Sequence, residues 1–224
     1  MVVTELACLH IKNHLPVTHP SNEALFAKLK AGLEAQAEYA DFDASLLSQL
    51  EDPSYIYILG GWDSVAQHMD EWIPSFTNQE IMGGLREHVD LVWLQHLDLD
   101  PGDPLHGETV EGIPYTDIVV GFARMFIAPG RGNRQRFTTT WAEIKHLLRK
   151  FEWPRDAVGA WRIDCELDDD GNRKEEFVVF VGWDSIDESF SLSEDKGNDE
   201  VHRLLRENTV GWELKHAKFV FPDI

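Results

Sequence analysis

Cysteine and positive charge are both scarce in this chain of 224 residues. Cys8 and Cys165 are its two cysteines, and each lies in an apolar segment, which is typical of buried free thiols in a reducing compartment. Forty acidic residues oppose twenty basic ones, for a formal net charge of −20. Because such a surface repels phosphate groups, we expect neither nucleic acid nor an anionic membrane as a partner.

Long apolar runs are also missing. No segment approaches the roughly 20 apolar residues that a membrane-spanning helix needs. The first residues, MVVTELACLHIKN, lack the basic stretch and apolar centre of a secretory signal. We therefore expect a cytoplasmic protein. Its hydrophobic content of 43% and its eight tryptophans are sufficient for a packed core.

The sequence motifs of several enzyme classes are absent. The chain has no Gly-rich phosphate loop, no His-Glu-x-x-His and no Gly-x-Ser-x-Gly. Three histidines occur close together, at His10, His14 and His19, but Pro16 prevents a shared helical face. We therefore expect no metal at these histidines, and we expect no cofactor elsewhere.

The chain does contain an internal repeat. The segment GWDS at Gly61–Ser64 recurs at Gly182–Ser185, 121 residues later. NQEIMGGLRE, from Asn78, matches NDEVHRLLRE, from Asn198, at a shift of 120, and an LQH near the end of the first copy falls on an LKH at the same shift. Three matches in the same order indicate a tandem duplication of a unit of about 105 residues.

Each copy predicts the order strand, helix, strand, strand, helices, strand, which is the ferredoxin-like arrangement. The apolar patterns place the strands of the first copy at 3–12, 44–50, 55–60 and 91–97, and those of the second at 117–127, 159–167, 177–181 and 212–220. The long helices are expected from residue 22, capped by Ser21, and over 134–151, with a further helix capped by Asn78.

The repeated GWDS segment is interpreted as the corner between a strand and a helix. Ser64 is placed to cap the helix with Gln67 as its capping-box partner, and Ser185 and Glu188 repeat that pattern. The tryptophan is expected to anchor the corner in the core. This role is structural in both copies.

The repeats are expected at 1–100 and 115–224, with a linker at 101–114 that is rich in Pro, Gly and acidic residues. Helices cover one face of a four-stranded sheet, and a duplicated chain can cover the other face with its second sheet. The predicted fold is therefore α+β, with two tandem ferredoxin-like repeats whose antiparallel sheets face each other as a barrel within one chain. Such a chain needs no second molecule, so we expect at most a weak homodimer.

The stretch LGGWDSVAQHMDEWIPSFTNQEI combines a strand-end tryptophan, a short helix with a histidine and a Pro-Ser turn, and WLQHL follows it. In these features the chain resembles the dimeric α+β barrel superfamily, and within it the antibiotic-biosynthesis-monooxygenase-like proteins, in the tandem-repeat form of fungal secondary metabolism. The resemblance implies a mixed set of activities: cofactor-free monooxygenases, polyketide cyclases, haem-degrading enzymes and decarboxylases. The histidine that the cyclases carry after the short helix has no counterpart in IPSFTN, which weakens a cyclase interpretation.

His68 and His10 are the candidate catalytic bases. The counterpart of His68 in the second copy is Ser189, so His68 is present in one copy only, as an active-site residue can be. His10 shares a strand face with Leu6 and Cys8. Imidazole titrates near neutrality and can move a proton. The alternative for each is a histidine at the surface or at a frayed strand end.

Tyr57 and Arg124 are candidates for stabilising an enolate. The alternative for Tyr57 is an ordinary core tyrosine. A buried Arg124 must be paired, either with a carboxylate such as Asp117 or Asp164 or with an anionic substrate. The residues expected to bind substrate are Trp72, Trp93, His96 and Trp161. His96 has a counterpart in His216, so strand geometry is an alternative reason for its presence.

These features together predict a small-molecule enzyme of secondary metabolism. We expect an apolar polyketide- or terpenoid-type substrate in the barrel cavity, with the working site in the first repeat. Acid–base chemistry without a cofactor would drive a cyclisation, rearrangement or elimination. The alternatives are a cofactor-free monooxygenase acting on a phenolic substrate and a non-catalytic small-molecule binding protein.

Overall fold

A computed structural model describes residues 1–100, 113–114, 117–130, 132–150, 157–164, 166–167, 171, 174–193 and 199–220. The chain divides into two compact units: unit 1 comprises Met1–Val110 and Ala217–Ile224, and unit 2 comprises Glu111–His216. Most of the expected linker, most of the expected hairpin at 168–174, and Cys165 lie outside the described residues.

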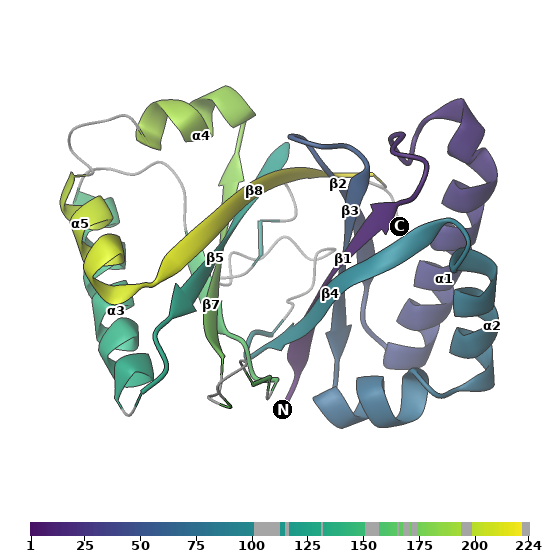
Figure 1. Cartoon of the computed structure of the whole chain (residues 1–224), viewed down its shortest axis with the longest axis horizontal. Coiled ribbons are helices and arrows are strands. Elements are labelled where there is room, and N and C mark those ends of the chain that lie inside the picture. The colour runs from purple at the N-terminus through teal and green to yellow at the C-terminus, as the bar shows by residue number, and fades with distance from the viewer. Residues whose placement is uncertain are drawn as a thin grey trace. The chain divides into compact units, whose positions relative to one another are not determined.

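Unit 1 contains a four-stranded antiparallel sheet in the order β4-β1-β3-β2. The last residues of β8 pair with β2, with Leu47 opposite Phe219. In Figure 1, α1 and α2 lie along one side of these strands. The elements in chain order are β1 (Val3–Ile11), a 3-10 helix η1 (Pro20–Asn22), α1 (Glu23–Ala40), β2 (Ala44–Gln49), β3 (Tyr55–Trp62), a π-helix η2 (Gln67–Trp72), α2 (Phe76–Leu85) and β4 (Val89–Leu97).

Unit 2 repeats this order of elements, with the strands in the order β8-β5-β7-β6. β7 pairs antiparallel with both β5 and β6. The two ferredoxin-like repeats expected from the sequence are therefore present. The elements in chain order are β5 (Val119–Ile127), α3 (Asn133–Lys150), β6 (Ala157–Trp161), β7 (Glu175–Trp183), α4 (Ile186–Ser193), α5 (Asp199–Asn208) and β8 (Gly211–Phe219).

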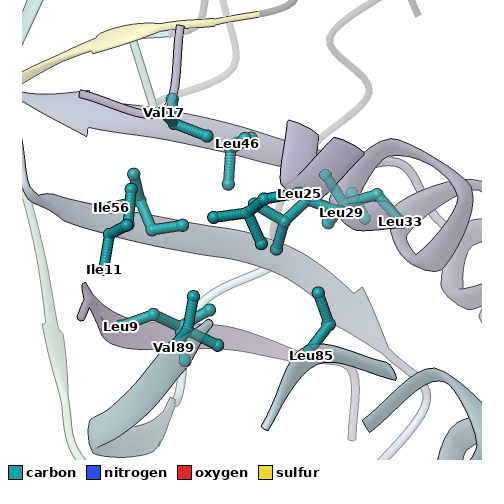
Figure 2. Packing of buried hydrophobic residues seen from close by; sticks show 11 residues of the cluster. Leu9, Ile11, Val17, Leu25, Leu29, Leu33, Leu46, Ile56, Leu85 and Val89 are labelled. Atoms are coloured by element: carbon teal, nitrogen blue, oxygen red, sulfur yellow. The ribbon is translucent and has the colours of Figure 1, made fainter. Parts of the chain in front are cut away.

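The core of unit 1 lies between α1 and the sheet. Leucines spaced four residues apart form one apolar stripe on α1, which packs on the strands. Figure 2 shows this stripe directed at residues of β2 and β3. The residues of the stripe are Leu25, Leu29 and Leu33, and the strand residues that they approach include Leu46 and Ile56. Among the described residues, no helix is both long and apolar enough to cross a membrane.

The corner between strand and helix is built as the GWDS segment predicted. Ser64 Oγ accepts the backbone N–H of Gln67 at 3.1 Å, and Gln67 Oε1 accepts the N–H of the residue before the cap at 2.8 Å. In unit 2 Ser185 Oγ accepts the backbone N–H of Glu188 at 3.2 Å, and Glu188 Oε2 accepts the N–H of Asp184 at 2.8 Å. Both capping boxes are therefore confirmed. In unit 1 the helix that follows is the π-helix η2.

Two other predicted caps are wrong. Ser21 lies inside η1, and Asn22 occupies the cap position of α1, where its side chain makes no capping hydrogen bond. The cap of α2 is Ser75, whose Oγ accepts the N–H of Asn78 at 3.1 Å. Asn78 instead donates its side-chain amide to the carbonyl of Ile73 at 2.9 Å. Ser75 takes the cap because its backbone is extended there, as a cap residue requires.

Candidate functional site

The sheet of unit 1 has two faces, because successive strand residues point to opposite sides. We call the face that packs on α1 the helix face, and the other the opposite face. Glu5 belongs to the helix face, since its carboxylate contacts Gln36 of α1. His96 pairs with Glu5 across β1 and β4 and shares that face.

The predicted site residues of unit 1 are divided between these two faces. His68, on η2, contacts His96 on the helix face. Tyr57 and Trp93 are neighbours on the opposite face, with ring centroids 6.0 Å apart. A single cavity cannot be lined by both groups. The residues of the helix face are His68, Trp72 and His96, and those of the opposite face are His10, Tyr57 and Trp93.

A buried polar cluster on the helix face of unit 1 consists of Glu5, Gln36, Trp62, His68 and His96. His68 Nδ1 and His96 Nε2 lie 2.8 Å apart, so one ring donates to the other. Glu5 Oε2 accepts a hydrogen bond from Gln36 Nε2 and one from Trp62 Nε1, both at 2.8 Å. His68 Nε2 lies 3.8 Å from the same oxygen. The buried carboxylate therefore has both donors and an imidazole close to it.

The environment of Glu5 disfavours its charged form. Burial raises the pKa of the Glu5 carboxyl above its ordinary value. The hydrogen bond from Trp62, the charge of His96 and the hydrogen bond from Gln36 act in the other direction without reversing the shift. Glu5 can therefore take up a proton at a higher pH than an exposed glutamate does.

Aromatic rings enclose the cluster. The ring of His68 stacks on Trp62 with centroids 4.2 Å apart and planes within 6°. Trp72, which the sequence assigned to substrate binding, packs on Tyr39 at 5.1 Å and on Trp62 at 6.2 Å. A π-helix such as η2 frequently marks a functional site. Here η2 brings His68 and Trp72 to the same side of the sheet.

His10 and Tyr57 have partners of their own on the opposite face. The Tyr57 hydroxyl donates to Gln49 Oε1 at 2.8 Å, which makes it a hydrogen-bonded core residue. His10 lies near the end of β1, where its Nε2 is 3.2 Å from Nδ1 of His14. Its ring also contacts Tyr55 at 4.8 Å. These positions match the alternatives stated for both residues.

Arg124 forms the internal ion pair that its burial requires. Its guanidinium makes a two-pronged contact with Glu176, at 2.5 and 3.2 Å, and a third contact with Glu213 at 3.2 Å. The carboxylates named from the sequence were Asp117 and Asp164; Asp164 is paired with Arg162 at 3.4 Å. Glu176 on β7 and Glu213 on β8 hold Arg124.

The structure places an apolar pocket of about 170 Å³ inside unit 2. It lies between the sheet and helices α3, α4 and α5, on the face that corresponds to the helix face of unit 1. Arg124 alternates with the pocket-lining residues of β5 and so points to the other side of the sheet. Trp161 packs in the core against Phe137 and Phe177. The apolar lining includes Ala123, Met125, Ile144, Val179, Val181 and Leu205.

A buried serine and histidine form a polar corner beside this pocket. Ser189, on α4, lines the pocket, and its Oγ lies 2.7 Å from Nε2 of His216 on β8. His216 is fully buried. A second imidazole, that of His202 on α5, also lines the pocket. Leu214 lines the pocket and is 42% exposed, so the pocket lies next to solvent at β8.

The pocket and the polar cluster occupy equivalent places in the two units. β1 and β5 each pair a valine with the corner tryptophan, Trp62 in unit 1 and Trp183 in unit 2. Two residues further along these strands stand Glu5 and Gly121. At this position unit 1 carries the carboxylate of Glu5, whereas unit 2 has a glycine, which has no side chain.

The hydrogen-bonded pairs are equivalent as well. The internal repeat aligns His68 with Ser189 and His96 with His216. The structure joins His68 to His96 at 2.8 Å in unit 1 and Ser189 to His216 at 2.7 Å in unit 2. Each unit therefore has, at the same place, a hydrogen-bonded pair of side chains that joins a helix to a strand. In unit 2 the pocket of about 170 Å³ lies beside this pair.

Glu5, Gly121 and Ser189 are not among the site residues predicted from the sequence, which placed the working cavity in the first repeat. A signal for Glu5 was present, since it is the one charge on the strand face that it shares with Val3 and Ala7. Within the described residues, no group of three or more His, Cys, Asp or Glu side chains is arranged to hold a metal ion.

No protein-family model matches the chain, and no curated protein matches it. Solved structures share its fold over almost the whole length. An anthrone oxidase-like protein has a TM-score of 0.63 at 13% identity, over 98% of this chain and 92% of its own. A candidate monooxygenase from Fusobacterium nucleatum has 0.59 at 9% identity, over 98% and 93%. A candidate chlorite dismutase has 0.60 at 8% identity, over 99% and 95%.

Identities this low show the fold and leave the reaction open. The proteins named in these matches are enzymes of different kinds, which agrees with a fold that hosts several chemistries. The fold class expected from the sequence is confirmed. The chain has the α+β fold of two tandem ferredoxin-like repeats, and it shares this fold with the solved structures named above.

Proposed function

We propose that this protein is an enzyme that binds a small apolar molecule in the pocket of unit 2 and transfers a proton through Ser189 and His216. One observation carries the proposal. A largely apolar pocket of about 170 Å³ has a buried, hydrogen-bonded serine and histidine at its edge. An apolar pocket with a few convergent polar groups is the usual form of a small-molecule site.

The geometry supports a two-step proton relay. Ser189 lines the pocket and His216 lies behind it, so a bound molecule meets the serine first. The hydroxyl takes a proton from an O–H, or from a C–H beside a carbonyl, while its own proton passes to His216 Nε2. Imidazole suits this role because it titrates near neutrality. Return of the proton to another atom of the substrate restores the pair.

The reactions that such a relay serves are the acid–base reactions expected from the sequence. Removal of a proton beside a carbonyl gives an enolate. Reprotonation at another carbon is a rearrangement, attack on a second carbonyl in the molecule is a cyclisation, and loss of a leaving group is an elimination. The apolar walls exclude water, which would otherwise protonate the enolate at random. A polyketide- or terpenoid-type substrate has the few polar groups that this pocket accepts.

The pocket volume limits the reacting part of the substrate. Cavities of about 150 Å³ accept benzene in proteins. A pocket of about 170 Å³ therefore has room for one ring with small substituents beside Ser189. Larger molecules would have to extend past Leu214, where the pocket adjoins solvent.

A second candidate reaction is the oxygenation of a phenol. The pocket would hold an aromatic ring, and a phenol that gives its proton to Ser189 and His216 becomes electron-rich. Addition of O₂ to the ring forms a carbon–oxygen bond, and loss of water from the hydroperoxide leaves a quinone. O₂ is the oxidant and is consumed in equal amount. The structural matches include an anthrone oxidase-like protein and a candidate monooxygenase, which is why this reaction is tested beside the first.

One experiment separates these reactions from simple binding. Phenylacetone, which has an acidic C–H between a benzene ring and a carbonyl, is incubated in D₂O, and its deuterium uptake is followed by NMR. The proposal predicts uptake faster than in buffer, with a loss of about 10²- to 10⁴-fold in Ser189→Ala and His216→Ala. In a parallel experiment with small phenols as substrates, an oxygen electrode measures O₂ consumption and so detects oxygenation. Binding of these probes with neither exchange nor oxygen uptake would identify a binding protein and overturn the enzyme proposal.

A further inference from the structure

Gly121 is an unusual residue for its position. It lies in the middle of β5, where glycine weakens a strand because it has no side chain to pack. It is not among the glycines whose φ is positive, so the backbone does not require it. A glycine in such a place often marks a close approach by a ligand or another backbone. Gly121 also lines the pocket of unit 2.

A side chain at this position would collide with the indole of Trp183 beside the polar corner. A Cβ atom added to Gly121 would lie 2.7 Å from Nε1 and 3.3 Å from Cδ1 of Trp183. It would also lie 3.5 Å from Cδ2 of His216. The first of these distances is too short for a carbon atom, so the indole would have to move. A single methyl group would therefore alter the part of the pocket next to the serine and histidine.

Unit 1 shows what a side chain does at the equivalent position. Glu5 extends from β1 into the space between the sheet and α1, where it accepts hydrogen bonds from Gln36 and Trp62. Both partners are held at 2.8 Å, and Glu5 itself is 3% exposed. The space that is a pocket in unit 2 is occupied by the protein's own polar groups in unit 1.

We infer that Gly121 is the residue that determines the size of ligand in this protein. Because Gly121 has no side chain, the indole of Trp183 lies against β5. This packing leaves room for one apolar ring between β5 and the helices of unit 2, with an oxygen substituent directed at Ser189. The ligand class is a single-ring phenol or ring ketone. The inference rests on the proposed function for the place where the substrate binds, and it is tested by binding alone.

The test is a ¹⁹F NMR titration of the full chain with 4-fluorophenol. Wild-type protein is expected to bind this probe, and Gly121→Ala is expected to weaken binding at least tenfold. Gly83→Ala is the matched control, because a Cβ at Gly83 in α2 would meet no atom within 4 Å. That variant should bind as wild type does. Ala123→Val, which fills the same pocket from the next inward position of β5, should also weaken binding.

The outcomes are distinct. Equal affinity in wild type and Gly121→Ala would overturn the role of Gly121 and leave the proposed function standing. A Gly121→Ala chain that does not fold, by circular dichroism, would assign the glycine to packing against Trp183 and also overturn it. Binding that follows the predicted pattern without exchange of any substrate proton would overturn the proposed function alone. Wild-type protein that does not bind the probe would overturn both.

Discussion

Glu5 and Gly121 stand at equivalent positions in the two units, each two residues along its strand from the valine that faces the corner tryptophan. In unit 1 the glutamate accepts hydrogen bonds from Gln36 and Trp62. In unit 2 the glycine lines an apolar pocket of about 170 Å³. The duplication has thus produced one filled site and one open site on the same fold, and the open one is the candidate for binding.

Glu5→Gln should change how stability depends on pH. Burial raises the pKa of the Glu5 carboxyl above its ordinary value of 4.5. A carboxyl whose pKa is higher in the folded state than in the unfolded state stabilises the folded protein. That stabilisation is complete below the unfolded-state pKa and is lost as the pH rises through the folded-state pKa. In wild type this contribution should therefore fall as pH rises from about 4.5. The glutamine keeps an oxygen for Gln36 and Trp62 and does not titrate.

Urea unfolding between pH 4 and pH 8 measures this difference. The free energy of unfolding of Glu5→Gln, relative to wild type, should increase with pH across the window. His68 and His96 also face the carboxyl. His96→Asn, measured alongside, identifies their share. Curves for wild type and Glu5→Gln that run parallel throughout would show that the carboxyl is not held in a destabilising environment.

Leu29→Ala should destabilise unit 1 by about 2 to 5 kcal/mol, because it opens a cavity in the core between α1 and the sheet. Leu91→Ala is the matched control. Leu91 lies on β4 and is 54% exposed, so its removal should change stability by less than about 0.5 kcal/mol. Thermal and urea unfolding check both values. Equal losses in the two variants would contradict the packing described for α1.

Ser75→Ala should cost about 1 kcal/mol, because Ser75 Oγ accepts the N–H of Asn78 at the start of α2. Ser21→Ala, the cap that the sequence suggested for α1, should cost close to nothing, since α1 has no side-chain cap bond. Chemical unfolding of the two variants under one set of conditions compares them. A larger loss in Ser21→Ala would restore the original assignment.

His68→Ala and His216→Ala separate the two units as sites of chemistry. His68 lies in the filled cluster of unit 1, so its loss should lower stability and leave the exchange rate per folded molecule near that of wild type. His216 supports Ser189 at the pocket, so its loss should slow exchange. A normal rate in His216→Ala with a slow rate in His68→Ala would return the active site to unit 1, where the sequence analysis expected it.

The sequence predicted the fold well because its signals are local and repeated. Ser64 and Ser185 each precede a capping-box partner by three residues, and the leucine spacing of α1 fixes its buried stripe. Strand alternation likewise separates one face from the next. These patterns depend on residues close together in the chain.

The site could not be predicted in the same way, because it depends on strand register and on what lies across the sheet. Nothing local in the sequence places His68 and Tyr57 on different faces, since that follows from how β1, β3 and η2 meet. Gly121 is recognised as a candidate site residue only when its strand register is compared with that of Glu5. The choice of unit 1 rested on residues present in one copy only, whereas the pocket lies where the second copy has Gly121 at the position equivalent to Glu5.

The most direct measurement is a crystal soaked in 4-iodophenol, with the iodine located by its anomalous signal. The account predicts one strong iodine peak in unit 2, between β5 and α3, with the phenol oxygen close to Ser189 Oγ. The ring should lie against Gly121 and Trp183. A peak beside His68 and His96 in unit 1, or crystals in which the pocket of unit 2 takes up no iodophenol, would contradict it.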